Sequence, residues 1–317
     1  MRLGWFAWAV ATVPLYDRTA MLTAAPTRSR AAAFVALTKP RIIELLLVST
    51  VPAMIVAQDG LPPLWLIIAT VAGGTLSAGG ANALNMYIDR DIDAEMDRTA
   101  NRPLVTGEIQ PNEALWFAVG IEAIAVVFLA VVVNVLAAAL ALAACLFYVF
   151  VYTIWLKRTS KQNIVIGGAA GAAPALIGWA AVTNSLGWTP WIMFAIVFLW
   201  TPPHFWALAI RYRDDYASAS VPMLPSVVGH WKTTQQILVY SVLVFIATMV
   251  LWPVAGLGWI YGVAAVVIGV WFVYGAWDLL QETDLAAIDT KAIRYFAFSI
   301  THLTVVFAAM AIDRLVL

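Results

Sequence analysis

The sequence is poor in charged residues. Asp, Glu, Lys and Arg together make up 11% of its 317 residues, whereas a water-soluble domain usually carries about 25%. Hydrophobic residues make up 63%, and the mean hydropathy is +0.87. Because a folded chain of this size with so little polar surface does not dissolve in water, the composition predicts a protein embedded in a lipid bilayer.

Cysteine and basic clusters are scarce as well. Cys145 is the single cysteine, which excludes an intramolecular disulfide and a cysteine metal site. The formal net charge is zero, and no stripe of basic residues alternates with aromatic ones. Nucleic-acid-binding proteins carry such a basic footprint, so the sequence predicts no nucleic-acid partner.

Long apolar stretches are abundant instead. Nine of them reach the roughly 20 residues that a helix needs to span the hydrocarbon core. Backbone groups in lipid have no water to bond with, so such segments are helices. The sequence therefore predicts an all-α integral membrane protein, a bundle of nine transmembrane helices. The stretches lie near 42–58, 63–88, 114–133, 136–156, 163–183, 190–210, 234–254, 256–280 and 292–312.

The basic residues predict the orientation of this bundle. Connections that carry Lys and Arg stay in the cytoplasm, and nearly all of the basic residues fall on one side of a nine-helix arrangement. We therefore expect a multi-pass protein of the cell's inner (plasma) membrane, with its N-terminus inside and its C-terminus outside. The residues on the inner side include Lys39, Arg90, Arg98, Arg102, Lys157, Arg158, Arg211, Arg213, Lys291 and Arg294, and Arg314 falls on the other side.

The N-terminal residues 1–35 are assigned to a tail, and residues 36–317 to the membrane domain. The tail holds an apolar stretch of about a dozen residues, as a signal peptide does, but a small-residue cleavage site is not clear. A peripheral helix, or a true start at Met21, fits the same residues. No function is assigned to the tail.

Acidic residues gather directly after the second apolar stretch, in NMYIDRDIDAEMDRTANRP. If the helix continues, Asn85, Asp89 and Asp93 lie one above the other on one face, at i, i+4 and i+8. Like charges one turn apart repel, and Mg²⁺, which prefers carboxylate oxygens together with substrate phosphates, would remove that repulsion. Asp91 and Glu95 fit a solvated loop better, because they point away from this ladder.

A second polar cluster follows the sixth apolar stretch, on the same side of the predicted bundle, with Asp214 and Asp215. Arg102, Lys157 and Arg158 are expected to emerge there too. Metal-binding acids among cations suit a diphosphate, whose oxygens they would bridge and neutralise. The apolar surroundings predict that the other end of the substrate is a lipid chain.

The pattern NxxxDxxxD at Asn85, Asp89 and Asp93, within nine predicted spans, resembles the UbiA superfamily of intramembrane prenyltransferases. The likeness extends through TKPR, NMYIDRDIDAEMDRTANRPL, YTIWLKR, GGAAGAAPALIGWAAVT and WTPPHFWALAIRYRDDYASASVPMLP. It covers nearly the whole domain, and this ordered set of motifs is similar to the haem-prenylating branch of the superfamily.

This resemblance implies a helical bundle with a central cavity that opens to lipid and is roofed by the two polar connections. It implies catalytic roles for Asp89, Asp93, Asp215 and His204. The diphosphate would be bound by Asn85, Arg102, Lys157 and Arg158, and Mg²⁺ by Asn85, Asp89, Asp93, Asp214 and Asp215. Many members carry a second DxxxD after the sixth helix, but four residues after Asp215 this chain has Ala219, so the ligands of a second metal ion stay open.

The reaction that the resemblance implies transfers the farnesyl group of farnesyl diphosphate to the vinyl group of haem B. Mg²⁺ would favour departure of diphosphate from the allylic C1, and water would quench the cation that follows attack by the vinyl group. The product would be haem O, received by a haem A synthase. Haem as the acceptor follows from the resemblance alone.

His204 lies in the cytoplasmic half of the sixth predicted helix, and a polar residue at membrane depth is a functional candidate. Its imidazole could ligate the haem iron or position the vinyl group. A histidine satisfied by a backbone carbonyl freed by Pro202 and Pro203 fits equally well.

Two other functions compete. A related transferase could act on a quinone precursor or a chlorin, although the TPPHFWALA and DYASASVPMLP motifs favour haem. A transporter with an acidic cytoplasmic mouth is the alternative of another class, but transporters place ionisable residues near the midplane on broken helices.

Overall fold

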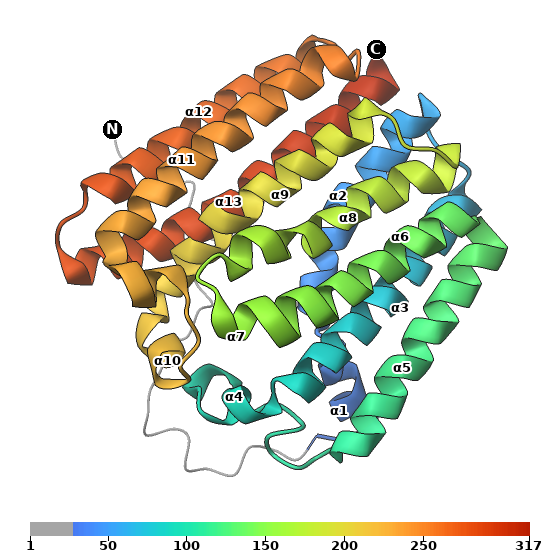
Figure 1. Cartoon of the computed structure of the whole chain (residues 1–317). Coiled ribbons are helices and arrows are strands. Elements are labelled where there is room, and N and C mark those ends of the chain that lie inside the picture. Colours follow the sequence, from blue (N-terminus) through green and yellow to red (C-terminus); the bar gives the residue numbers. More distant parts are fainter. Residues whose placement is uncertain (1–27) are drawn as a thin grey trace.

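The computed structural model describes residues 28–317, apart from the side chains of residues 41–47 and 285–286. It consists of helices joined by turns and loops (Figure 1). The α-helices of eight or more residues are α1 (Arg30–Leu37), α2 (Pro40–Gln58), α3 (Leu64–Ile88), α5 (Pro111–Phe128), α6 (Val135–Leu146), α8 (Asn163–Thr183), α9 (Trp188–Arg211), α11 (Leu224–Val254), α12 (Trp259–Gln281) and α13 (Leu285–Val316). The other helical segments are α4 (Arg90–Ala94), η2 (Asp97–Thr99), η3 (Leu129–Val133), η4 (Phe147–Leu156), α7 (Lys157–Thr159) and α10 (Arg213–Ser218).

Eight helices among the described residues are long and apolar enough to cross a membrane, and α2, with 19 residues, coincides with the first predicted stretch. Each of the other predicted stretches falls on one of the eight. Two of these spans are composite, because the π-helix η3 continues α5 and the π-helix η4 joins α6 to α7. The predicted all-α membrane bundle is confirmed. The signal-peptide and Met21 interpretations concern residues outside the described part, and part of the predicted tail forms α1.

Small residues let the central helices approach closely, as is usual where membrane helices pack. α2 and α8 cross in the middle of the bundle (Figure 1). At Gly178 of α8, a Cβ atom would lie 2.5 Å from the backbone oxygen of Thr50 in α2. Because neither backbone can give way, this contact admits only glycine and fixes the distance between the two helices.

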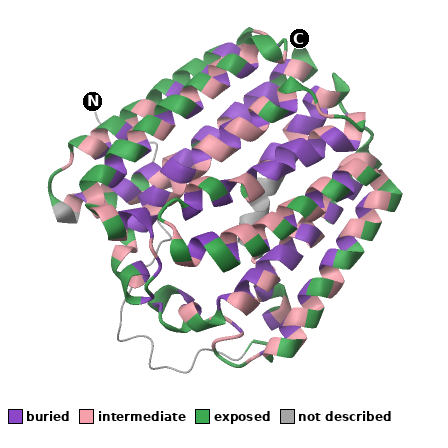
Figure 2. Cartoon of the chain, in the orientation of Figure 1, coloured by how far each residue is buried: buried purple, intermediate pink, exposed green. Residues whose placement is uncertain are grey.

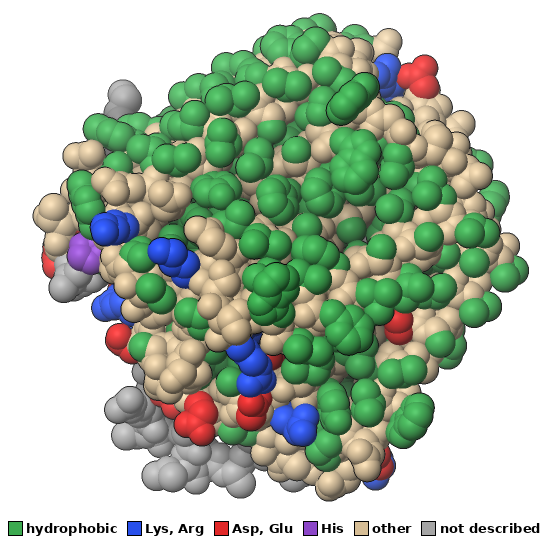
Figure 3. All heavy atoms as spheres, in the orientation of Figure 1, with side chains coloured by type: hydrophobic (Ala, Val, Ile, Leu, Met, Phe, Trp, Pro, Cys, Tyr) green, Lys and Arg blue, Asp and Glu red, His purple; other side chains and the backbone are tan. Residues whose placement is uncertain are grey.

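The outer surface of the bundle is apolar. Buried residues line the inward faces of the helices (Figure 2), and hydrophobic side chains cover most of the face seen in Figure 3, with most of the charged ones at the left and lower left and a few at the right. Trp116, Val131 and Trp271 are 73%, 79% and 60% exposed. Large apolar patches mark contact with a partner or a membrane, and here they extend over the spanning helices, as a lipid-facing surface requires.

The two ends of the bundle differ. The long connections that contain α4 and α10 lie at one end, near α7 (Figure 1). At the other end, Asp313 near the end of α13 accepts hydrogen bonds from the backbone amides of Gly258 (2.6 Å) and Tyr261 (3.0 Å) at the start of α12. Arg314 pairs with Asp59, after α2, at 3.0 Å. Side chains of α13 thus tie it to both neighbours at the end remote from α4.

Candidate active site

The acidic ladder begins in α3 and continues through α4. The amide of Asp89 donates to the carbonyl of Asn85 at 2.9 Å, and that of Asp93 to the carbonyl of Asp89 at 2.8 Å. The i→i+4 spacing therefore persists across the junction of the two helices. Asn85, Asp89 and Asp93 are 3%, 0% and 0% exposed, whereas Asp91 and Glu95 lie at the surface. This is the placement that the helical spacing predicts.

The protein supplies its own cations to this ladder. Lys157 of α7 forms an ion pair with Asp89, and Arg102, in the loop after α4, forms one with Asp93. Like-charge repulsion between the two carboxylates is thus relieved without a metal ion. The sequence predicted that these cations lie near the acids, but not that Lys157 pairs with Asp89 directly.

Arg158 contacts both the buried Asp89 and the exposed Asp91. Its guanidinium donates two hydrogen bonds of 2.7 Å to Asp91 and lies 3.8 Å from the Oδ1 atom of Asp89. These hydrogen bonds lower the pKa of Asp91 to about 2. Arg158 is thereby held over the buried ladder by a carboxylate that is itself 60% exposed.

Two contacts of Asn85 were not predicted. The Nζ atom of Lys39 donates to Asn85 Oδ1 at 2.8 Å, and Asn85 Nδ2 donates to the hydroxyl of Thr153 at 3.0 Å. Lys39 precedes Pro40 and has a φ of 52°, and strained residues of this kind cluster at functional sites. Burial, and then the nearby positive charges of Arg102 and Lys157, lower the pKa of Lys39 well below its usual value.

The second polar connection reaches the first one. Arg98 lies 5.8 Å from the ring centroids of Tyr212 and Tyr216, and its Nη2 atom donates to the Tyr216 hydroxyl at 3.4 Å. On α10, Asp214 is exposed and Asp215 is half-buried. Within residues 28–317, neither joins the ladder in a group of three His, Cys, Asp or Glu side chains placed to hold a metal ion.

The ladder keeps capacity for a metal ion. The Oδ1 atoms of Asp89 and Asp93 are buried and have no hydrogen-bond partner among the described residues, while the Oδ2 atoms form the ion pairs with Lys157 and Arg102. Mg²⁺ is usually held by one or two carboxylates, with water and substrate phosphates completing its shell. Two carboxylate oxygens without a hydrogen bond and a nearby amide fit that requirement.

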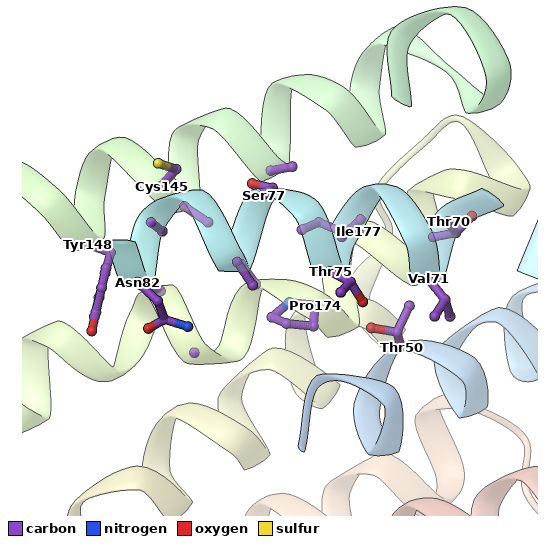
Figure 4. A pocket seen from close by; sticks show the side chains of 18 residues that line it. Thr50, Thr70, Val71, Thr75, Ser77, Asn82, Cys145, Tyr148, Pro174 and Ile177 are labelled. Atoms are coloured by element: carbon purple, nitrogen blue, oxygen red, sulfur yellow. The ribbon is translucent and has the colours of Figure 1, made fainter. Parts of the chain in front are cut away.

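An apolar cavity lies between α2, α3, α6, η4 and α8 (Figure 4). Its empty volume is about 930 Å³, part of it open to the outside. Asn82 and Tyr148 lie at one end of the view, and Thr70 and Val71 at the other. Asn82 is three residues before Asn85 in α3, so the end of the cavity formed by Asn82 and Tyr148 adjoins the ladder. The wall includes Gly74, Ala78, Ala81, Ala141, Ala144, Ala170 and Gly171.

His204 lies apart from this cavity lining. Its ring stacks between Trp200 and Phe296, with centroid distances of 4.1 and 4.4 Å, and its Nδ1 atom is 2.6 Å from the hydroxyl of Ser299 in α13. The partner is thus a hydroxyl and not a freed backbone carbonyl. The Ser299 hydroxyl donates to the carbonyl of Phe296 at 2.6 Å, so His204 is the donor to Ser299 and its Nε2 atom keeps a lone pair.

Comparison with known proteins agrees with the fold and the motifs. The sequence profile of the UbiA prenyltransferase family matches residues 46–300. The chain belongs to this family. A protein of Clavibacter sepedonicus named protoheme IX farnesyltransferase is 56% identical, over 89% of this chain and 92% of its own length. One of the same name from Kineococcus radiotolerans is 47% identical, over 96% and 95%.

Solved structures share the fold at lower identity. A structure described as digeranylgeranylglyceryl phosphate synthase is 18% identical and has a TM-score of 0.74, covering 91% of this chain and 99% of that one. A UbiA homologue from Archaeoglobus fulgidus, solved with DMAPP and Mg²⁺, is 16% identical with a TM-score of 0.55, covering 85% and 98%.

Proposed function

We propose that this protein transfers the farnesyl group of farnesyl diphosphate to the vinyl group of haem B and adds water, giving haem O. One observation carries the proposal: a buried ladder of acids with cation partners adjoins the Asn82 end of an apolar cavity. The relatives named protoheme IX farnesyltransferase supply the acceptor.

The diphosphate is expected to bind among Arg102, Lys157 and Arg158. These cations converge on Asp89 and Asp93, so an incoming diphosphate can exchange partners with the carboxylates. The cations then neutralise the leaving group as the bond between C1 and oxygen breaks. Charge-assisted hydrogen bonds of this kind are about twice as strong as neutral ones.

Mg²⁺ is the expected cofactor. Asn85, Asp89 and Asp93 would hold it. Asp215 and then Asp214, both on α10, are the candidate ligands of a second ion. When bound, the metal supplies positive charge that stabilises the departing diphosphate. The Archaeoglobus homologue solved with DMAPP and Mg²⁺ supports this assignment.

The farnesyl chain is expected to occupy the cavity of Figure 4. From Asn82 to Thr70 the lining follows α3 for 82 − 70 = 12 residues, or about 18 Å at 1.5 Å per residue. Small side chains on the facing helices leave room for an isoprenoid. Water excluded from this space cannot attack the allylic cation before the vinyl group does.

The acceptor side is assigned to His204. Its Nδ1 atom donates to Ser299, which leaves Nε2 as the nitrogen that could ligate iron or position the porphyrin. Balanced over the reaction, the vinyl group forms a bond with C1, water adds to the resulting cation, and diphosphate and a proton are released. The haem O produced is then available to a haem A synthase.

The polar end of the bundle is expected to face the cytoplasm, in the inner (plasma) membrane, because it carries most of the Lys and Arg residues. Residues 36–317 form the catalytic domain in this proposal. No function is proposed for the part of the tail that precedes α1.

The deciding experiment incubates the purified protein with haem B, farnesyl diphosphate and Mg²⁺ and determines the mass of the porphyrin product. A gain of one farnesyl group and one hydroxyl group is expected, and it should disappear when EDTA is added. Farnesylation of a quinone precursor or a chlorin, with haem B left unchanged, would contradict the proposal.

A further inference from the structure

The π-helix η4 (Phe147–Leu156) has an unusual effect on which residues share a face. A π-helix bonds i to i+5, and π segments are mostly single turns, often at functional sites. This one has 10 residues. In an α-helix, residues five apart point about 140° away from each other, at 3.6 residues per turn. In η4, Tyr148 lines the cavity, and Thr153, five residues on, meets Asn85.

Thr153 is placed by this turn to act on Asn85. Its side chain is fully buried, and its hydroxyl donates to the carbonyl of Tyr148 at 2.9 Å. A hydroxyl has one hydrogen, so toward Asn85 the oxygen can only accept. Asn85 must therefore present its Nδ2 atom to Thr153, and its Oδ1 atom faces the other way, toward Lys39.

The other partners of Asn85 are charged. Nδ2 also donates to Asp89 Oδ2 at 2.8 Å, and Oδ1 accepts from Lys39. In the proposed reaction both charged groups turn toward the metal and the diphosphate, which loosens their hold on the amide. Thr153 is uncharged and would keep its two hydrogen bonds through that change.

We propose that Thr153 is a positioning residue, which holds the amide of Asn85 so that its Oδ1 atom stays available as a neutral ligand for Mg²⁺–diphosphate. The inference rests on the proposed function and deepens it. Thr153 itself touches neither substrate nor metal; it acts through Asn85, and the π-helical turn places it within reach.

The test compares Thr153→Val, which keeps the shape but loses the hydroxyl, with Thr153→Ser, which keeps the hydroxyl. Initial rates of haem O formation are measured against Mg²⁺ concentration at saturating substrates. Because supporting residues of a metal site typically contribute about 10–100-fold, the valine variant should need about tenfold more Mg²⁺ for half-maximal rate. The serine variant keeps the hydroxyl, so its Mg²⁺ concentration for half-maximal rate should stay within about threefold of the wild-type value.

Thr248→Val is the matched control. Thr248 of α11 is also fully buried and donates to a backbone carbonyl, that of Phe245, at 2.7 Å, but it has no contact with the ladder. The Mg²⁺ requirement should be unchanged in this variant. An equal increase in Thr153→Val and Thr248→Val would overturn the proposal, and so would a serine variant as impaired as the valine one.

A binding measurement separates this proposal from the proposed function. Calorimetry of a non-reacting farnesyl thiodiphosphate, with and without Mg²⁺, reports the metal-dependent gain in affinity without turnover. That gain in affinity should fall about tenfold in Thr153→Val, at the low end of the contribution of residues that support a metal site. It should persist in Thr153→Ser. If wild type made no haem O, the reaction would be wrong, but this comparison would still decide the role of Thr153. An unchanged gain in the valine variant would refute it.

Discussion

Asp89→Asn is expected to damage the protein in two separable ways. Asp89 is fully buried, and its partner Lys157 has a side chain only 10% exposed. Removing one member of a buried ion pair leaves the other charge uncompensated and costs about 3–5 kcal/mol. Because Arg158 also lies 3.8 Å from Asp89, we expect the upper part of that range. Turnover should fall by about 100-fold or more, the effect of losing one electrostatic contact to a developing charge.

The double variant Asp89→Asn, Lys157→Met separates stability from chemistry. Replacing a whole buried ion pair by neutral groups is often close to neutral, so the free energy of unfolding should return to within about 1 kcal/mol of wild type. Turnover should stay lost, because neither the metal nor the diphosphate regains its ligand. Unfolding by denaturant in detergent micelles gives the stability, and mass analysis of the porphyrin gives the turnover.

This reasoning would be refuted if both stability and turnover recovered in the double variant. If the double variant were stable and formed haem O at a rate within about tenfold of wild type, which corresponds to an activation barrier raised by no more than about 1.4 kcal/mol, the ion pair would be a packing feature. Lys157→Met alone serves as the control, and it should be destabilised in the same way as Asp89→Asn.

Three further variants test other parts of the site. Asp91→Asn should change turnover less than about threefold, since exposed ion pairs contribute little. Because the pKa of Asp91 is lowered to about 2, any stability that this carboxylate adds is present above about pH 4, where the unfolded group is ionised, and is lost as the pH falls toward 2. Thermal unfolding midpoints measured across this pH range would reveal the loss. His204→Ala should weaken haem B binding by about tenfold, or 1.4 kcal/mol, and leave farnesyl diphosphate affinity unchanged when each substrate is titrated separately; loss of both affinities would point to a misfolded α9. Gly171→Leu should raise the KM for farnesyl diphosphate by about tenfold or more, again 1.4 kcal/mol, because Gly171 lines the cavity and a Cβ atom there meets nothing within 4 Å. Gly120→Leu, where a Cβ atom also meets nothing within 4 Å, is its control, and equal KM values would contradict the assignment of the cavity.

The spanning helices were predictable because lipid imposes a length and a composition on each one. The stretch at 163–183 has the bounds of α8. The ladder was predictable for a similar reason: i, i+4 spacing from Asn85 follows from helix geometry once α3 is known to run to residue 88.

The partners of the ladder were not predictable in the same way. The pairing of Lys157 with Asp89 depends on the π-helical winding of η4, and no local pattern in YTIWLKR announces that winding. Thr153 and Lys39 meet Asn85 across distances of 68 and 46 residues in the chain. Such contacts are decided by the packing of three helices, which a single sequence read by its periodicity does not give.

The ties at the far end of α13 bear on how a molecule as broad as haem could enter. Asp313 caps α12, and Arg314 forms an ion pair with Asp59, directly after α2. α2, α12 and α13 are therefore pinned together at this end. Spreading between these three helices is therefore easier at the opposite end. We expect any spreading that admits the porphyrin to be greatest beside α4 and α10 and to close again around the reactive vinyl group, with the pinned end acting as the hinge.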